Sequence, residues 1–213
     1  MFSTSLDSLE KLEMNGDNPQ EFLLQELQLM EAEIQRLRAE GIARLNFLFT
    51  ITSALFGGVL VIVGLGRLTD EQIIVGVFIA SFILFVISLS TFEYALSRDV
   101  LCDKNARGTG RIRKYFLLKY KEIENHVTWQ TDDAPTHWIT SNRSDIRRVA
   151  LFFTSTLAGI AGGSFVFWIF PSLAIALVAF IFILIITGLI LIVWAEQRFK
   201  NACEKANREQ KFV

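Results

Sequence analysis

Four long stretches of the chain contain no charged side chain, and they set its architecture. They cover Leu45 to Gly66, Gln72 to Phe92, Val149 to Phe170 and Ser172 to Ala195. About 20 apolar residues in a helix cross the ~30 Å hydrocarbon core of a bilayer. The pattern therefore predicts an all-α integral membrane protein with four transmembrane helices, arranged as two hairpins over residues 45–97 and 149–195.

Charged residues gather in the remaining segments, 1–44, 98–148 and 196–213. These segments hold 20 of the 21 Lys and Arg residues, and only Arg67 lies elsewhere. An excess of Lys and Arg marks the cytoplasmic side of a membrane protein. We therefore predict a multi-pass protein of the cell (inner) membrane with both termini in the cytoplasm. The two outer turns, near Arg67 and Pro171, are too short to bind an external ligand.

A periodic pattern precedes the first stretch and predicts a long cytoplasmic helix over residues 18–44. Asn18 is a favourable N-cap, and Pro19 suits the first helical position. Apolar residues then alternate at spacings of four and three: Leu23, Leu27, Met30, Ile34 and Leu37. Such a seam is typical of a short coiled coil that joins subunits. It is also typical of an amphipathic helix packed on the chain's own cytoplasmic part.

The central connection, residues 98–148, predicts an amphipathic cytoplasmic helix over about 111–127. Its basic residues are Arg111, Arg113, Lys114, Lys119 and Lys121. Basic amphipathic helices between spans often lie on the inner leaflet, and Trp129 and Trp138 suit the same interface. The alternative is a docking site for a soluble partner or a phosphorylated ligand. The sequence Arg107 to Arg111, with two glycines, is interpreted as a flexible turn.

The N-terminal and central segments carry opposite charge. Residues 1–44 have a net charge of −5, and residues 98–148 have a net charge of +4. We therefore expect the N-terminal helix to dock against the central connection.

Small residues recur at four-residue spacing within the spans. Gly159 and Gly163 form a G-x-x-x-G pair, and Gly57 and Gly58 follow Ser53 and Ala54 at the same spacing. Small side chains let helix backbones approach closely. The spacing fits packing between spans of one chain and fits self-association equally well.

The residues offer no catalytic or cofactor site. Away from their ends the spans contain no ionisable side chain, which argues against an ion-coupled transporter. His126 and His137 lie eleven positions apart with no metal-binding motif, and no nucleophile–base pattern is visible. The net charge of −1 gives no reason to expect nucleic-acid binding. Cys102 and Cys203 are expected to be free thiols in the reducing cytoplasm.

Two sequence runs, together with a later Trp129, carry a resemblance. Glu21-Phe22-Leu23-Leu24-Gln25-Glu26-Leu27 leads into a span, and Arg111-Ile112-Arg113-Lys114-Tyr115 lies in the central connection. The chain resembles small, uncharacterised prokaryotic four-span membrane proteins, and is similar in layout to membrane effectors of anti-phage defence operons. The resemblance implies an effector in which a soluble sensor triggers membrane disruption. Together with the small-residue faces and the N-terminal seam, it favours a homo-oligomeric, channel-like effector in the lipid bilayer, which receives its signal from a cytoplasmic protein partner or a small signalling ligand. The alternative is a non-conducting anchor that holds a soluble partner at the inner leaflet.

Overall fold

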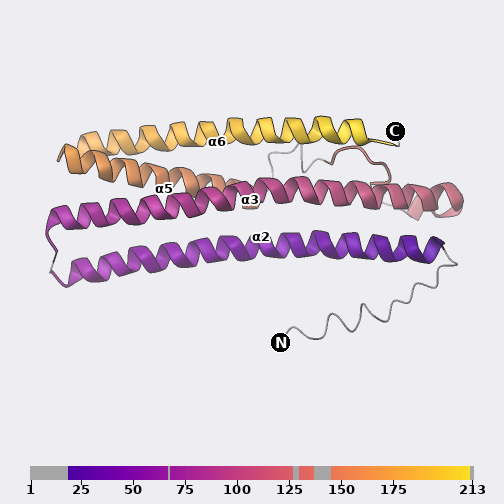
Figure 1. Ribbon diagram of the computed structural model, residues 1–213, viewed down its shortest axis with the longest axis horizontal. Coiled ribbons are helices and arrows are strands. Elements are labelled where there is room, and N and C mark those ends of the chain that lie inside the picture. The colour runs from indigo at the N-terminus through magenta and orange to yellow at the C-terminus, as the bar shows by residue number, and fades with distance from the viewer. Residues whose placement is uncertain (1–18, 67, 127–129, 137–144, 212–213) are drawn as a thin grey trace.

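The computed structural model in Figure 1 describes residues 19–66, 68–126, 130–136 and 145–211. Within these ranges the chain is all-α and contains no strand. The elements are α2 (Pro19–Gly64), α3 (Asp70–Lys119), the short 3-10 helix η1 (Lys121–His126), α5 (Asp145–Ile169) and α6 (Leu173–Glu209). The predicted cap Asn18 and the outer residue Arg67 lie outside the described residues.

The four α-helices are each long and apolar enough to span a membrane. Their apolar parts coincide with the four charge-free stretches of the sequence, so the chain is a multi-pass membrane protein. Figure 1 shows two antiparallel pairs, α2 with α3 and α5 with α6. Helix α3 packs against both α2 and α5 and joins the two pairs. We call residues 45–64, 70–97, 149–169 and 173–195 the membrane half.

Three of the helices continue without a break beyond the membrane half. Helix α3 has 50 residues, so it is about 75 Å long at 1.5 Å per residue. A membrane needs only about 30 Å of that length. The continuations of α2, α3 and α6, residues 19–44, 98–119 and 196–209, form what we call the polar extension. Helix α5 begins at the boundary and has no continuation.

The predicted separate helix over 111–127 and the predicted turn over 107–111 are wrong. Residues 107–111 lie inside α3, and the helix ends at Lys119. The two glycines serve close contacts: a Cβ at Gly108 would meet the Met30 side chain, and one at Gly110 would overlap the backbone oxygen of Asp132. Glycine here permits close approach, and the helix continues despite its low helix propensity.

The hydrophobic core lies where the membrane half meets the polar extension. All four helices contribute to it, through the buried residues Leu45, Phe92, Leu96, Ala150, Leu191 and Ala195. The rings of Phe92 and Trp194 lie 5.9 Å apart beside it. The start of α5 is therefore packed between α2, α3 and α6, and this packing positions Arg147 in the first turn of α5.

Hydroxyl groups in the spans mainly donate hydrogen bonds to backbone carbonyl oxygens of their own helices. Thr50 and Thr52 donate to the carbonyl oxygens of Asn46 and Leu48. The Ser88 and Thr154 hydroxyls differ, because they lie 2.7 Å apart and link α3 to α5 at a buried position.

Candidate functional site

A stripe of ionisable residues lies along α3 in the polar extension. Asp99, Asp103, Arg107 and Arg111 follow at intervals of four residues, which places them on one face of a helix. Asp99, Asp103 and Arg107 are buried. Buried charges are rare in proteins unless they are paired. Each member of the stripe has a hydrogen-bond partner in a segment distant in the sequence.

The innermost group is an ionic cluster of Arg98, Asp99 and Arg147. Arg98 Nη2 donates to one carboxylate oxygen of Asp99 at 2.7 Å, and Arg147 Nη1 donates to the other at 3.0 Å. All three side chains are less than a tenth exposed. The guanidinium of Arg147 also lies over the Phe199 ring, 4.3 Å from its centroid. One carboxylate therefore ties α3 to the first turn of α5, beside α6.

Helix α2 reaches the same cluster through Gly41. This glycine is buried, and a Cβ there would overlap the Arg98 guanidinium. Arg98 therefore lies directly against the α2 backbone. All four helices meet at the cluster, and its charges lie directly beside the hydrophobic core.

A second polar group lies farther along the extension, where residues 130–136 run back beside α3 and α6 (Figure 1). Asp133 is fully buried. Its Oδ2 accepts from Arg111 Nε at 2.9 Å and from the Lys211 backbone N–H at 2.6 Å. Arg107 donates to the carbonyl oxygens of Asp133 and Ala206. This return segment therefore ties α3 to the end of α6.

Asp103 anchors the other end of the return segment. Its carboxylate accepts the backbone N–H of Thr136. Burial raises the pKa of the Asp103 carboxyl above its usual value, and the Thr136 hydrogen bonds and the Arg107 charge oppose that rise. The carboxylate thus replaces water as the partner of a buried backbone N–H.

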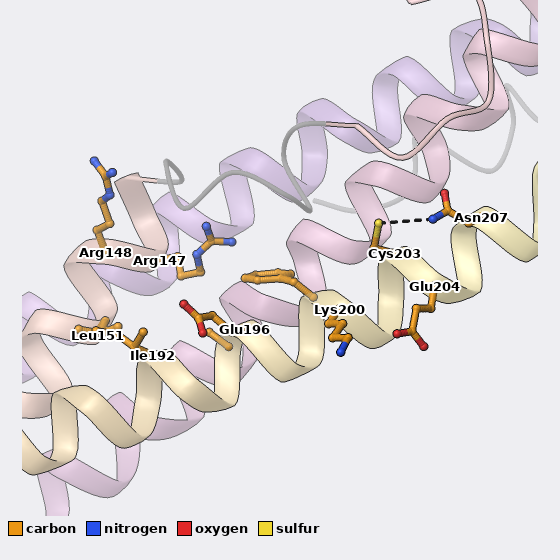
Figure 2. A pocket seen from close by; sticks show the side chains of 11 residues that line it. Arg147, Arg148, Leu151, Ile192, Glu196, Lys200, Cys203, Glu204 and Asn207 are labelled. Atoms are coloured by element: carbon orange, nitrogen blue, oxygen red, sulfur yellow. Dashed lines mark hydrogen bonds between the residues drawn. The ribbon is translucent and has the colours of Figure 1, made fainter. Parts of the chain in front are cut away.

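A pocket of about 500 Å³ opens between the start of α5 and α6. We call it the junction pocket. Figure 2 shows Arg147 and Arg148 projecting from α5, with Glu196, Lys200 and Glu204 on α6. Its lining also includes Leu151, Ile192, Ala195, Phe199, Cys203 and Asn207. It combines an apolar wall on the membrane side with charged groups on the other.

The predicted basic contact residues are not brought into one patch. Arg111 binds Asp133, whereas Arg113 donates to Glu31 of α2 at 2.7 Å. Lys119 lies near the Tyr120 ring. Lys114 and Lys121 are partly or fully exposed in the same part of the extension. Trp129 and Trp138 lie outside the described residues. Because α3 continues straight from the membrane half, its basic residues lie along the extension, and they do not form a separate surface helix.

The heptad seam of α2 faces α3 of the same chain. Met30 packs against Gly108, and Leu37 is buried. The remaining seam residues are partly buried: Leu23, Leu27 and Ile34. Together with the Arg113–Glu31 ion pair, this contact confirms that the acidic helix docks on the basic segment. The coiled coil between subunits stays a prediction.

The predicted small-residue positions have two different environments. Gly159 and Gly163 face Phe180 and Ala176 of α6, so the G-x-x-x-G pair packs two spans of one chain. A Cβ at Gly57 or Gly58 would meet nothing within 4 Å. Those two positions on α2 are open in the single chain.

The fold and these clusters define a helical multi-pass membrane protein with a polar extension joined to it by buried ion pairs. Over residues 19–66, 68–126, 130–136 and 145–211, no three His, Cys, Asp or Glu side chains are placed to hold a metal ion. Known protein families, curated proteins and solved structures give no match to the chain.

The two thiols should differ sharply in reactivity. Cys102 is only 3% exposed, and burial raises the pKa of its thiol, whereas Cys203 lines the junction pocket and is partly exposed. Since the thiolate is the nucleophile, maleimide should modify Cys203 in the folded protein and reach Cys102 only after denaturation. Mass spectrometry counts the adducts, and Cys203→Ser should abolish native labelling. Equal labelling rates at the two thiols would contradict the burial of Cys102.

Proposed function

We propose that the protein is an oligomeric, channel-like membrane effector. It receives a signal on its cytoplasmic side and perturbs the membrane, in the manner of anti-phage defence effectors. The observation that carries the proposal is the continuity of α2, α3 and α6 from the polar extension into the membrane half. A helix transmits a rotation or tilt along its length. A partner or ligand that binds the extension therefore has a direct mechanical route to the spans.

The buried clusters support this coupling. Asp99 joins α3 to α5 at the boundary, and Asp133 joins α3 to the end of α6. Interactions between packed helices hold discrete arrangements rather than a continuous range, so a shift in the extension is passed on as a change of arrangement. In this proposal the extension lies in the cytoplasm, because it belongs to segments 1–44, 98–148 and 196–213, which together hold 20 of the 21 Lys and Arg residues.

Helix α2 supplies the surface for self-association. In the membrane half it contacts α3, and its Phe49 ring meets Phe153 of α5, while much of the remainder is exposed: Leu60 is 70% exposed and Val61 is 65% exposed. Gly57 and Gly58 lie on this helix with open space beside them. Small residues at such a surface let a second helix approach closely. In an assembly through α2, the lipid-facing side of one chain becomes the contact with the next.

Substituting leucine for Gly57 should reduce assembly without harming the single chain. A Cβ at position 57 meets nothing within 4 Å in its own chain, whereas the leucine side chain would hold a second helix away. We expect native mass spectrometry of gently extracted protein to show a ring of four or more chains. The Gly57→Leu variant should shift that ring to smaller species and reduce dye release from liposomes.

Two further variants serve as controls. Gly76→Leu adds the same side chain at an open position on α3, and it should leave the assembly intact. Gly159→Leu would collide with Phe180 in the same chain, so it should lower the yield of folded protein. A wild-type monomer, or a ring that is indifferent to Gly57→Leu, would refute assembly through α2.

An anchor that holds a soluble partner at the inner leaflet is the second candidate. The observation that favours it is the apolar character of the spans: a pocket between α3, α5 and α6 in the membrane half is lined almost wholly by residues such as Phe78, Phe82 and Ile183. Such a lining offers no polar path within one chain. A monomeric native mass and liposomes that retain their dye would support the anchor.

A further inference from the structure

Helix α2 lies at one edge of the molecule (Figure 1), and a continuous row of residues runs along its face opposite the heptad seam. The row passes from the polar extension into the membrane half. Its members follow at alternating spacings of three and four residues, which keeps them on one side of a helix. Every member as far as Ser53 is exposed in the single chain. We call this row the outer seam, and it consists of Leu29, Ala32, Arg36, Ala39, Ala43, Asn46, Thr50, Ser53 and Gly57.

In the polar extension the outer seam is mostly apolar, although this part of α2 lies outside the charge-free stretches. Leu29 is 60% exposed, and the three alanines of the seam are exposed as well. The exposed neighbours Gln35 and Glu40 are polar, as expected of a helix in water. A run of apolar side chains on a water-exposed surface marks a site of association. This part of the seam therefore suits contact with protein better than contact with water.

In the membrane half the same seam is polar or small, although this part of α2 faces hydrocarbon. Asn46 follows the boundary directly, and Thr50 and Ser53 lie about 8 and 12 Å inside it at 1.5 Å per residue. The neighbouring Phe47 is 61% exposed and suits lipid. Lipid tails offer no hydrogen bonds, whereas hydroxyl and amide side chains between packed helices form them across the contact. This part of the seam also suits contact with protein.

The whole seam fits a partner helix that passes through both media. Lipid would cover only its membrane part, and a soluble protein would cover only its extension. Helix α6 shows the ordinary pattern: the exposed Ile181 and Ile185 are apolar in the membrane half, and the exposed Asn201 and Glu204 are polar in the extension. The α2 seam has the reverse pattern. A second α2 has the same reversal at the same levels, so it matches the seam along its full length.

The charged member of the seam is compatible with such a partner. Arg36 lies 2.7 Å from a carboxylate oxygen of Glu33 and 3.6 Å from one of Glu40, about one turn away on either side. Two parallel copies of α2 bring two arginines and four glutamates to one level. A guanidinium has five N–H donors, enough to bind carboxylates of its own chain and of the other. The excess of acids therefore offsets the repulsion between the two arginines.

We propose that the outer seam is the contact between copies of this chain, with α2 packed parallel to α2 along both the polar extension and the membrane half. All copies cross the membrane in the same direction, so the same residue of each copy lies at the same level. The proposal rests on the proposed self-association through α2. It adds the partner helix, its direction and a contact in the extension.

Cysteine cross-linking in membranes tests the contact. A disulfide forms where two Cα atoms come within about 7 Å. Ala39→Cys probes the extension and Ser53→Cys probes the membrane half, each in a Cys203→Ser background in which Cys102 is buried. After oxidation with copper phenanthroline, each variant should give a covalent dimer of twice the chain mass, at least about fivefold more abundant than in control positions.

Exposed positions on two other helices provide the controls. Asn201→Cys on α6 lies as many residues outside the boundary as Ala39, and Ser90→Cys on α3 lies near the depth of Ser53. Neither should cross-link. Ala39→Glu places like charges on both sides of the contact and should reduce the Ser53→Cys cross-link about fivefold, whereas Asn201→Glu should leave it unchanged. Continued protection of Cys102 from maleimide confirms that each variant is folded.

The outcomes separate this contact from the proposed function. A Ser53→Cys dimer without an Ala39→Cys dimer would confine the contact to the membrane half and overturn the full-length seam, although assembly through α2 would stand. Both dimers, with a native mass of only two chains, would support the seam and refute the ring. Absence of both dimers, control positions that cross-link equally well, or a product whose extra mass is that of another protein would each overturn the proposal.

Discussion

Replacing Asp99 by alanine is expected to lower the free energy of unfolding by about 3 to 5 kcal/mol. The substitution leaves two buried guanidinium groups, on Arg98 and Arg147, without the carboxylate that they share. An uncompensated buried charge costs far more than the lost pair contributes by itself. Titration of the solubilised protein with SDS, followed by circular dichroism, measures the change.

An exposed ion pair provides the control for Asp99→Ala. Arg36 and Glu33 lie 2.7 Å apart on α2, and the arginine side chain is 64% exposed. Glu33→Ala should cost about 0.5 kcal/mol or less. The triple variant Arg98→Met, Asp99→Leu and Arg147→Met removes all three charges of the cluster and should recover much of the loss. A cost for Asp99→Ala no larger than that for Glu33→Ala would show that the cluster contributes little to stability.

Replacing Gly110 by alanine should detach the return segment from α3 and destabilise the protein by about 1 to 3 kcal/mol. The added methyl group would overlap the backbone oxygen of Asp132. Backbone held by the neighbouring Asp133 and Thr136 contacts has little freedom to move aside. Faster proteolytic cleavage within residues 130–136 and a lower unfolding midpoint would report the effect.

Gly108 is a matched control two residues away on the same helix. A methyl group there meets the end of the flexible Met30 side chain, 2.7 Å from its sulfur. That side chain can change rotamer, and alanine favours the helix over glycine by about 0.5 to 1 kcal/mol. Gly108→Ala should therefore be neutral or stabilising. If both alanine variants behave alike, the close approach of Asp132 does not constrain the segment.

The four spans follow from the sequence because an uninterrupted apolar stretch is a local property. The length needed to cross a membrane is fixed, so counting residues finds each span. The docking of the N-terminal helix was also predictable from opposite net charges. The Arg113–Glu31 ion pair joins the basic segment of α3 to the acidic segment of α2, as the opposite charges predict.

The buried polar contacts of α3 were beyond sequence reasoning because the residues that meet there are distant along the chain. Asp99 and Arg147 lie 48 positions apart, and Arg107 and Asp133 lie 26 apart. The available signal was the four-residue spacing from Asp99 to Arg111, which marks one helix face only if residues 107–111 are helical. Glycine at positions 108 and 110 led to the prediction of a turn, because glycine has a low helix propensity. The contacts with other segments that keep these residues helical cannot be read from the local sequence.

Similar reasoning explains the small residues of the spans. Gly57 and Gly159 both occur at four-residue spacing from another small residue, yet only Gly159 faces a helix of its own chain. Small residues at four-residue spacing indicate that another helix can approach closely. The spacing does not reveal which helix that is.

Because α2, α3 and α6 cross the boundary without interruption, the two halves of the molecule share one helical phase. Each residue advances a helix by about 100°. A single residue inserted near position 97 of α3 would turn Asp103, Arg107 and Arg111 away from their partners, although no contact residue had changed. An insertion of seven residues shifts the phase by only about 20°. Variation in the length of the polar extension is therefore restricted to near-whole numbers of turns, made in all three helices together.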